Sequence, residues 1–202
     1  MKVTEQKRLA LIEAAKDEFI EFGFNAANMD RVCEKASTSK RTLYRHFESK
    51  ELLFTAAINA MVEKQNEHTT FVYQAHVALD SQLKAYLQRK VTSLYSEVGL
   101  PVVRMIVGEF IREPELAQRY LALMGGKDVE LKQWIENAIS DGRLISGDSQ
   151  QIMATLLNLF HGQFLWPQLV ANLSQPNEQE QQAHINEIVR IFLRAYVADW
   201  RE

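Results

Sequence analysis

The sequence has few of the residues that cross-link a chain or interrupt a helix. Cys33 is its only cysteine, so no disulfide can form within the chain. Four prolines and eight glycines among 202 residues leave long stretches without a break. No apolar run approaches the length of about 18 residues typical of a transmembrane helix, and the start, MKVTEQKRLA, lacks the apolar run of a secretory signal. We therefore expect a cytoplasmic protein without a membrane segment.

A large positive charge is also absent. The formal net charge is −3 and the pI is about 6.0. These values argue against a protein that wraps nucleic acid nonspecifically, because such proteins are positive over most of their surface. The charge is nevertheless uneven, since residues 1–50 carry net +2 and residues 51–202 carry net −5. Residues 31–50 alone carry net +4, which predicts a local basic surface.

The pattern that is present throughout is helical. Apolar residues recur at intervals of three and four, and no run alternates apolar with polar residues, so the sequence predicts an all-α fold. The first helix is expected to begin at Thr4 as N-cap and to stop at Gly23, followed by helices at 28 to about 36 and 40 to about 46. Ser49 is expected to cap a fourth helix that runs into the seventies. The remaining helices are predicted at 80–97, 101–112, 114–124, 126–142, 149–172 and 178–201.

The short connection between the second and third predicted helices indicates a helix-turn-helix unit. Ser39 can cap the third helix, on which Leu43 and Phe47 form an inward stripe while the basic residues project elsewhere. A helix placed in the major groove of DNA needs such an exposed face of donors near its N-terminus. The alternative is a solvated basic face on an ordinary helical domain, because charge on a short helix is common.

The order of the residues is more specific than their charge. The run FGFNAANMDRVCEKASTSKRTLYRHFESKELLF resembles the N-terminal DNA-binding domain of the TetR/AcrR family of bacterial transcriptional regulators, over about residues 5–55. The resemblance implies a homodimer in which a three-helix helix-turn-helix domain, residues 1–48, joins a larger helical effector-binding and dimerisation domain, residues 49–202. It also implies a repressor that a small molecule releases from double-stranded operator DNA.

The same resemblance implies which residues contact DNA. Base and phosphate contacts fall on Thr38, Ser39, Lys40, Arg41, Thr42, Tyr44 and His46, and a further phosphate contact falls on Lys50. Three positions depart from the common family pattern: Ser37 replaces a glycine, Asn28 replaces a threonine, and Arg41 replaces a small residue. Arg41 is therefore the best candidate for a base contact particular to this protein. Asn28 is expected to serve equally well as an N-cap.

The C-terminal part resembles the AcrR-like branch of the family in the run RMIVGEFIREPELAQRYLALMGGKDVELKQWIENAISDGRL. The middle helices supply many aromatic and methionine residues. They predict an aromatic-rich pocket with few fixed charges, which would favour an apolar or aromatic effector. The residues nominated for the effector site are Arg104, Glu109, Tyr120, Trp134, His161 and Phe164. For His161, a place in the core or in an interface is the alternative.

The segment LLNLFHGQFLWPQL, residues 156–169, is apolar on almost all sides, which is more than one core face requires. Together with the apolar stripe of the last helix, it predicts a homodimer interface formed by residues 149–172 and 178–201. Gly162 would permit close approach of two helices there. A thick monomer core is the alternative.

No chemistry beyond binding is expected. The five histidines form no i, i+4 pair and no Cys-x-x-Cys occurs, so neither a metal nor a cofactor is predicted. No segment offers a nucleophile, a base and an orienting acid at a recognisable spacing. Cys33 is interpreted as a small buried residue, with a thiol switch as the alternative. The rival function is a helical small-molecule carrier or enzyme that does not bind DNA.

Overall fold

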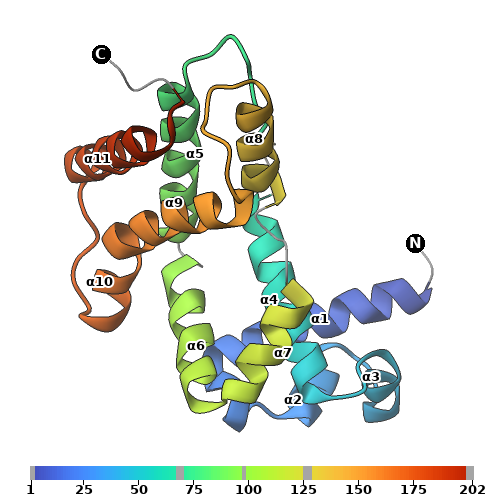
Figure 1. Cartoon of the computed structure of the whole chain (residues 1–202). Helices are drawn as coiled ribbons and strands as arrows, with labels where there is room; N and C mark the ends of the chain where they lie inside the picture. The colour runs from blue at the N-terminus through green and yellow to red at the C-terminus, as the bar shows by residue number, and fades with distance from the viewer. Residues whose placement is uncertain (1–2, 67–70, 97–98, 125–128, 199–202) are drawn as a thin grey trace. The chain divides into compact units, whose positions relative to one another are not determined.

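The computed structural model describes residues 3–66, 71–96, 99–124 and 129–198. These residues form helices and no β-sheet (Figure 1), which confirms the predicted all-α fold. The helices are α1 (Val3–Ala26), α2 (Met29–Lys35), α3 (Lys40–His46), α4 (Lys50–Asn66), α5 (Leu79–Leu94), α6 (Gly99–Arg112), α7 (Pro114–Met124), α8 (Val129–Ser140), α9 (Ser149–Phe164), α10 (Trp166–Val170) and α11 (Glu178–Tyr196). None of the helices in the described ranges combines the length and apolarity needed to cross a bilayer.

The chain divides into two compact units. Unit 1 comprises residues 1–68 and 101–125, and therefore holds α1 to α4 together with α7 and nearly all of α6. Unit 2 comprises residues 69–100 and 126–202, with α5 and α8 to α11. The predicted division between residues 48 and 49 separates DNA binding from effector binding and dimerisation. It concerns function rather than compactness, and it stays a prediction.

Unit 1 is built around α1, which packs against α2, α3 and α4. The rings of Phe19, Phe24 and Phe54 form its aromatic centre, with centroid distances of 4.9, 5.0 and 6.1 Å. Val102 and Ile106 of α6 are buried in the same core. Burial of these apolar side chains fixes how the first three helices pack, because each helix has one apolar face that must be covered.

Unit 2 is centred on Trp134 of α8, which is 1% exposed. Its indole N–H donates to Gln82 Oε1 at 3.0 Å, and the Phe71 ring stacks on it at 5.6 Å. The Gln82 amide also accepts from the Gln74 N–H and donates to the carbonyls of Gln74 and Val77, each at 2.9 Å. The buried Gln82 side chain thus satisfies backbone groups within residues 71–78, a segment that forms no helix.

That segment corrects the prediction for the fourth helix. Residues 71–78 are non-helical, so no helix runs on into the seventies. The helix predicted at 149–172 is also wrong, because it is divided into α9 and α10 at Leu165. Pro167 explains the break, since it lacks an N–H and its ring clashes with the carbonyl four residues earlier in a continuous helix.

Several helix ends differ from the prediction as well: α5 ends at Leu94 and not at 97, and α8 ends at Ser140 and not at 142. Thr4 lies inside α1, which begins at Val3, so it is not the N-cap. The last helix stops at Tyr196 and not at 201, because Val197 is extended and the chain turns to meet the loop after α8. There the Ile145 N–H donates to the Tyr196 carbonyl at 2.8 Å. Gly23, with a φ of 73°, interrupts the first helix as expected.

Candidate DNA-binding surface

α2 ends in a hydrogen-bonded turn that leads directly into α3. The Ser37 N–H donates to the Glu34 carbonyl at 3.0 Å, and the Thr38 N–H donates to the Cys33 carbonyl at 2.9 Å. This pair of bonds is the Schellman motif, which requires a left-handed residue at the first position after the helix cap. Ser37 supplies it with a φ of 49°, at a steric cost that a glycine would not have.

Side-chain caps fix where three helices begin. Asn28, Ser39 and Ser49 each accept a hydrogen bond from a backbone N–H two or three residues further on, at 2.7, 3.2 and 3.3 Å. The N-caps predicted at Asn28, Ser39 and Ser49 are confirmed, whereas the one predicted at Thr4 is not. Because a cap satisfies an amide that the helix itself cannot satisfy, Ser39 sets the first residue of α3.

α3 has one buried side and one exposed side. Leu43 is fully buried and Phe47 is 4% exposed, so the predicted inward stripe is confirmed. The exposed side consists of Lys40, Arg41, Tyr44 and Arg45. A fixed start and a fixed inner face give these four side chains a defined direction, which is what reading a groove requires.

Lys40 and Thr42, which are predicted to contact DNA, also have partners within the protein. Lys40 Nζ lies 2.8 Å from Asp30, whose hydrogen bond and charge raise the pKa of the lysine. Thr42 Oγ1 lies 3.1 Å from Ser39 Oγ. Nε2 of His46 is buried and has no hydrogen-bond partner among the described residues, so only the remainder of that ring is available to a ligand.

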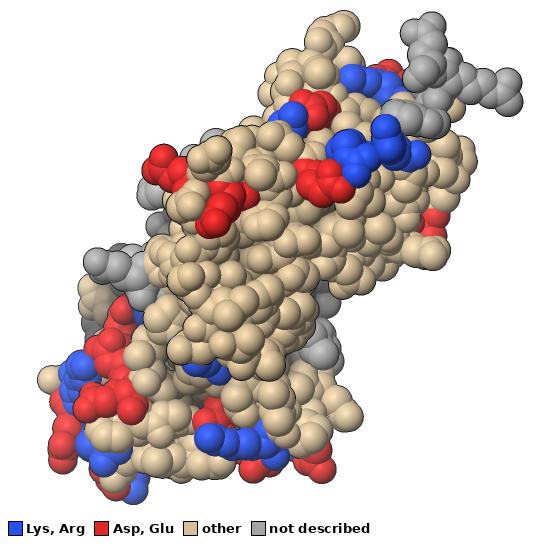
Figure 2. All heavy atoms as spheres, turned by 90° about the vertical axis from the view of Figure 1, so that its left-hand side faces the viewer, with Lys and Arg blue, Asp and Glu red and all other residues tan. Residues whose placement is uncertain are grey.

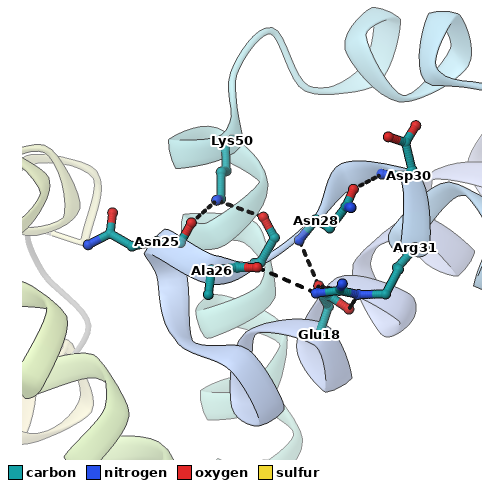
Figure 3. A network of polar contacts seen from close by, with 8 residues as sticks. Glu18, Asn25, Ala26, Asn28, Asp30, Arg31 and Lys50 are labelled. Carbon is teal, nitrogen blue, oxygen red and sulfur yellow. Dashed lines mark hydrogen bonds and ion pairs between the residues drawn. The ribbon is translucent and has the colours of Figure 1, made fainter.

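Lys50 has surroundings that the sequence did not indicate. Its Nζ donates to the carbonyl oxygens of Asn25 at 3.1 Å and Ala27 at 2.8 Å (Figure 3). The ammonium also lies 5.1 Å from the centre of the Phe24 ring. Burial lowers the pKa of Lys50, although nearby carboxylates act in the opposite direction. The two carbonyls are 25 and 23 residues away in the chain, so no local pattern could have revealed them.

Glu18 and Arg31 form a second polar centre that sequence reasoning missed. The guanidinium donates to the Glu18 carboxylate at 2.6 to 3.1 Å, and the Asn28 N–H donates to it at 2.6 Å (Figure 3). Burial alone would raise the pKa of Glu18, but the hydrogen bonds from Arg31 and Asn28 outweigh it, so the pKa is lowered. The ionised carboxylate therefore ties the start of α2 to α1.

Two family models match the chain. The model for bacterial regulatory proteins of the tetR family matches residues 11–57, which contain the capped turn and α3. The model for the AefR-like transcriptional repressor C-terminal domain matches residues 81–198, more than half of the chain. The chain belongs to the TetR family. The predicted family resemblance is thereby confirmed, and the C-terminal match is to the AefR-like domain.

Similar proteins cover most of this TetR-family chain. The crystal structure of a TetR family regulator from Pseudomonas syringae pv. tomato str. DC3000 is 32% identical, with a TM-score of 0.76 over 98% of this chain and 100% of that one. The flavonoid-responsive regulator FrrA is 29% identical, with a TM-score of 0.78 over 96% of this chain and 98% of that one. The HTH-type transcriptional regulator UidR of Escherichia coli K12 is 27% identical over 162 residues, covering 77% of this chain and 78% of UidR.

Family membership decides between the functions that the sequence left open. TetR-family proteins are transcriptional regulators that bind operator DNA and a small-molecule effector and act as dimers, and they are not enzymes. This chain is accordingly a DNA-binding transcriptional regulator. The rival function, a carrier or enzyme without DNA binding, is excluded.

The six residues nominated for the effector site are divided between the units. In unit 2, Trp134 and Phe164 are 1% and 0% exposed within the core, and His161 is half-buried on α9. In unit 1, Arg104 is exposed on α6, and the ring of Tyr120 lies 5.1 Å from that of Phe110. Burial raises the pKa of Tyr120. Their role in effector binding stays a prediction.

Glu109, the last of the six, is 4% exposed on α6. Its Oε1 lies 3.2 Å from Nη1 of Arg112, whose side chain is largely exposed. Its Oε2 is buried without a hydrogen-bond partner in the described ranges. A buried carboxylate oxygen without a hydrogen bond costs free energy of folding. The sequence alone did not indicate that Glu109 would be buried in this way.

Unit 2 has an open recess of about 410 Å³ on its surface. It is lined by Ala78, Leu79, Asp80, Gly142, Arg143, Leu193 and Val197, none of which was nominated from the sequence. Within the described ranges, no three side chains of His, Cys, Asp or Glu gather as a metal site would require. Cys33 is buried, and burial is the main reason that the pKa of its thiol is raised.

Proposed function

We propose that the protein is a homodimeric repressor that binds a near-palindromic operator through α3 and that a small molecule releases. The observation that carries this proposal is the capped and exposed recognition helix, whose inner face is fixed by Leu43 and Phe47. Because the proposed operator would lie on the DNA of a bacterial cell, we place the protein in the cytoplasm. Residues 1–48 would supply the DNA contacts apart from that at Lys50, and residues 49–202 the effector and dimer contacts.

The proposed DNA contacts keep the set drawn from the sequence. Arg41 is exposed and well placed to pair with a guanine in bidentate fashion, while Tyr44 and Lys40 are exposed beside it. The remaining contacts would come from Thr38, Ser39, Thr42, His46 and Lys50. At Lys50 the backbone N–H groups of the first turn of α4 offer a phosphate site that does not depend on the ammonium group of the side chain.

The proposed dimer interface is formed by residues 149–172 and 178–201. Residues 149–177 contain no Lys, Arg, Asp or Glu, and Trp166, Val170 and Leu173 are 47%, 78% and 58% exposed. Figure 2, which looks onto the side where α9 to α11 lie in Figure 1, shows a broad area without charged residues. Exposed apolar surface of this kind favours an interface over a solvated face.

Gly162 of α9 supports the same interface. It is exposed, and a Cβ atom built on it would meet nothing within 4 Å. The glycine is therefore not required by packing within the protomer, although glycine inside a helix is destabilising. Close approach of a second helix would explain its presence.

The proposed effector is an apolar or aromatic small molecule. Support comes from the aromatic residues of the C-terminal helices and from the likeness to FrrA, a regulator described as responsive to flavonoids. An aromatic ligand would be held mainly by burial of its rings, with a few polar groups fixing its orientation.

A mobility-shift titration with the DNA upstream of the protein's own gene tests the DNA-binding part. We expect a shift that competitor DNA of unrelated sequence does not remove and that weakens steeply with salt, because phosphate contacts release counterions. Binding that is equal for both DNAs would contradict the proposal.

A further inference from the structure

We propose that the Lys50 ammonium is a positioning residue for DNA binding: it holds the connection that leads from the break at Gly23 in α1 to the N-cap of α2, residues 23–28, and does not act by neutralising a phosphate. This connection is called the α1–α2 turn below. The proposal rests on the proposed DNA-binding function, because operator affinity is one of its readouts. It departs from the phosphate role that the sequence suggested for this side chain.

The first step concerns the carbonyl groups at the end of α1. The last carbonyls of a helix have no partner within it and carry the negative end of the helix dipole. Here three consecutive carbonyls, those of Asn25, Ala26 and Ala27, each receive a hydrogen bond from a cationic side chain. Lys50 donates to the first and third, and Nη2 of Arg31 approaches the second at 3.4 Å (Figure 3).

The second step concerns how fully the ammonium is engaged. An ammonium has three donors, and Lys50 uses two of them on carbonyls at 3.1 and 2.8 Å. Its charge also lies over the Phe24 ring, which belongs to the core of unit 1. To reach a phosphate, the side chain would have to release both carbonyls and leave this ring.

The third step links the turn to the recognition helix. Asn28 ends the turn and caps α2, and its own N–H is held by Glu18 of α1. α2 is joined to α3 by the Schellman turn and the Ser39 cap, which together make up the whole connection between the two helices. The orientation of α3 therefore depends on how firmly the α1–α2 turn is held.

The fourth step places α6 at the same turn. Glu109 Oε1 lies 3.0 Å from the position that a Cβ on Gly23 would occupy, and Gly23 has a φ of +73°. The negative charge of Glu109 acts on Lys50 as well, in the direction that favours its protonated form. α6 lies within the stretch that matches the AefR-like C-terminal domain, so this turn is one of the places where that domain's sequence meets the DNA-binding helices.

The test compares the full-length wild-type protein with Lys50→Met and Arg45→Met. Methionine keeps an unbranched stem beside Phe24 but removes the ammonium, and Arg45 is an exposed cation on α3 that serves as the matched loss of charge. Operator affinity is measured over a range of salt concentrations, well below the unfolding temperature of each variant. The active fraction of each preparation is counted by stoichiometric titration with operator.

We expect Lys50→Met to weaken operator binding at least tenfold without changing the slope of log affinity against log salt. A lost phosphate contact would instead reduce that slope by about 0.9 in each protomer, or about 1.8 for the dimer. A reduction of that size in Lys50→Met would overturn the proposal. Unchanged affinity of the active fraction would also overturn it, because Lys50 would then serve folding alone.

Hydrogen exchange of the free protein gives a readout that needs no DNA. Lys50→Met should speed amide exchange at Asn28 and along α2 at least tenfold, while Arg45→Met should leave those amides unchanged. Equal protection in wild type and Lys50→Met would overturn the proposal. If wild type bound no operator, the proposed function would fail, and this exchange result would still decide whether Lys50 holds the turn.

Discussion

Ser37 and Gly142 occupy equivalent positions in two copies of the same helix-ending motif. At the end of α8 the Gly142 N–H donates to the Ile139 carbonyl at 2.9 Å, as Ser37 does to Glu34 at the end of α2. Both residues have positive φ, 69° for the glycine and 49° for the serine. Only the serine carries a Cβ that opposes this conformation, so the turn between α2 and α3 stores strain that the turn after α8 does not.

Replacing Ser37 by glycine should therefore stabilise the protein. The relieved strain is about 1–2 kcal/mol, partly offset by the greater freedom of glycine in the unfolded chain, so the free energy of unfolding should rise by about 0.5–1 kcal/mol. Urea unfolding of both proteins measures the difference. The reverse change, Gly142→Ser, should lower the free energy of unfolding, and a loss of stability in Ser37→Gly would contradict the argument.

Arg41 should read sequence. Arg41→Ala is expected to reduce the difference in affinity between the operator and its single-base variants by about 1–3 kcal/mol at one position of each half-site. A competition titration with the set of single-base variants measures it. Tyr44→Phe, which keeps the exposed ring but loses a hydroxyl suited to phosphate, should weaken all these DNAs by one common factor. A uniform loss in Arg41→Ala would show that Arg41 contacts only the backbone.

At the scale of elements, Gln82 decides the course of residues 71–78. Its amide exchanges four hydrogen bonds with Gln74, Val77 and Trp134, all within the core of unit 2. Gln82→Met fills a similar volume but leaves those groups unpaired, so the free energy of unfolding should fall by about 2–3 kcal/mol. Gln133→Met on the exposed face of α8 is the control and should change it by less than about 0.5 kcal/mol. If thermal unfolding showed the same loss of stability in Gln82→Met and Gln133→Met, Gln82 would not determine the course of residues 71–78.

The sequence predicted the elements whose causes are local. The N-caps at Asn28, Ser39 and Ser49 and the break at Gly23 each depend on residues within a few positions, and the structure has these four. The N-cap predicted at Thr4 is the exception, because Thr4 lies inside α1. The family motif likewise identified the recognition helix. The prediction that the fourth helix runs into the seventies failed because the competing hydrogen bonds come from Gln82, a tertiary partner on another element.

The same distinction applies to the candidate site. Exposure of Arg41 follows from helical spacing against Leu43 and Phe47, which a sequence shows. The engagement of Lys50 with the end of α1 does not, because its partners become neighbours only when α4 packs on α1. From the sequence alone, the positive charge of Lys50 is as compatible with a phosphate contact as with a structural contact to the protein.

At the scale of the whole molecule, charge and apolar surface are separated along the chain. The basic window lies in residues 31–50, and residues 149–177 carry no charged side chain at all. The first would suit a polyanion, and the second would suit another copy of the chain, so we expect these two segments of the sequence to have different partners.

Gly162→Arg should disrupt the dimer without harming the protomer. A Cβ at this position meets nothing within 4 Å, and arginine favours the helix over glycine, so the variant should stay folded. A charge placed in the proposed interface should convert the dimer to a monomer, which light scattering after size-exclusion chromatography would show. Gly108→Arg on α6, where a Cβ is equally unobstructed, should remain a dimer. A dimeric Gly162→Arg would exclude α9 from the interface.

The central claim is that two copies of α3 read one operator together. Hydroxyl-radical footprinting of the upstream DNA with the wild-type protein tests it most directly. We predict two protected half-sites on one face of the duplex, with centres about 10 base pairs apart or a multiple of that spacing, because successive major grooves recur at the helical repeat. A single protected patch, or protection spread without regard to sequence, would contradict the account.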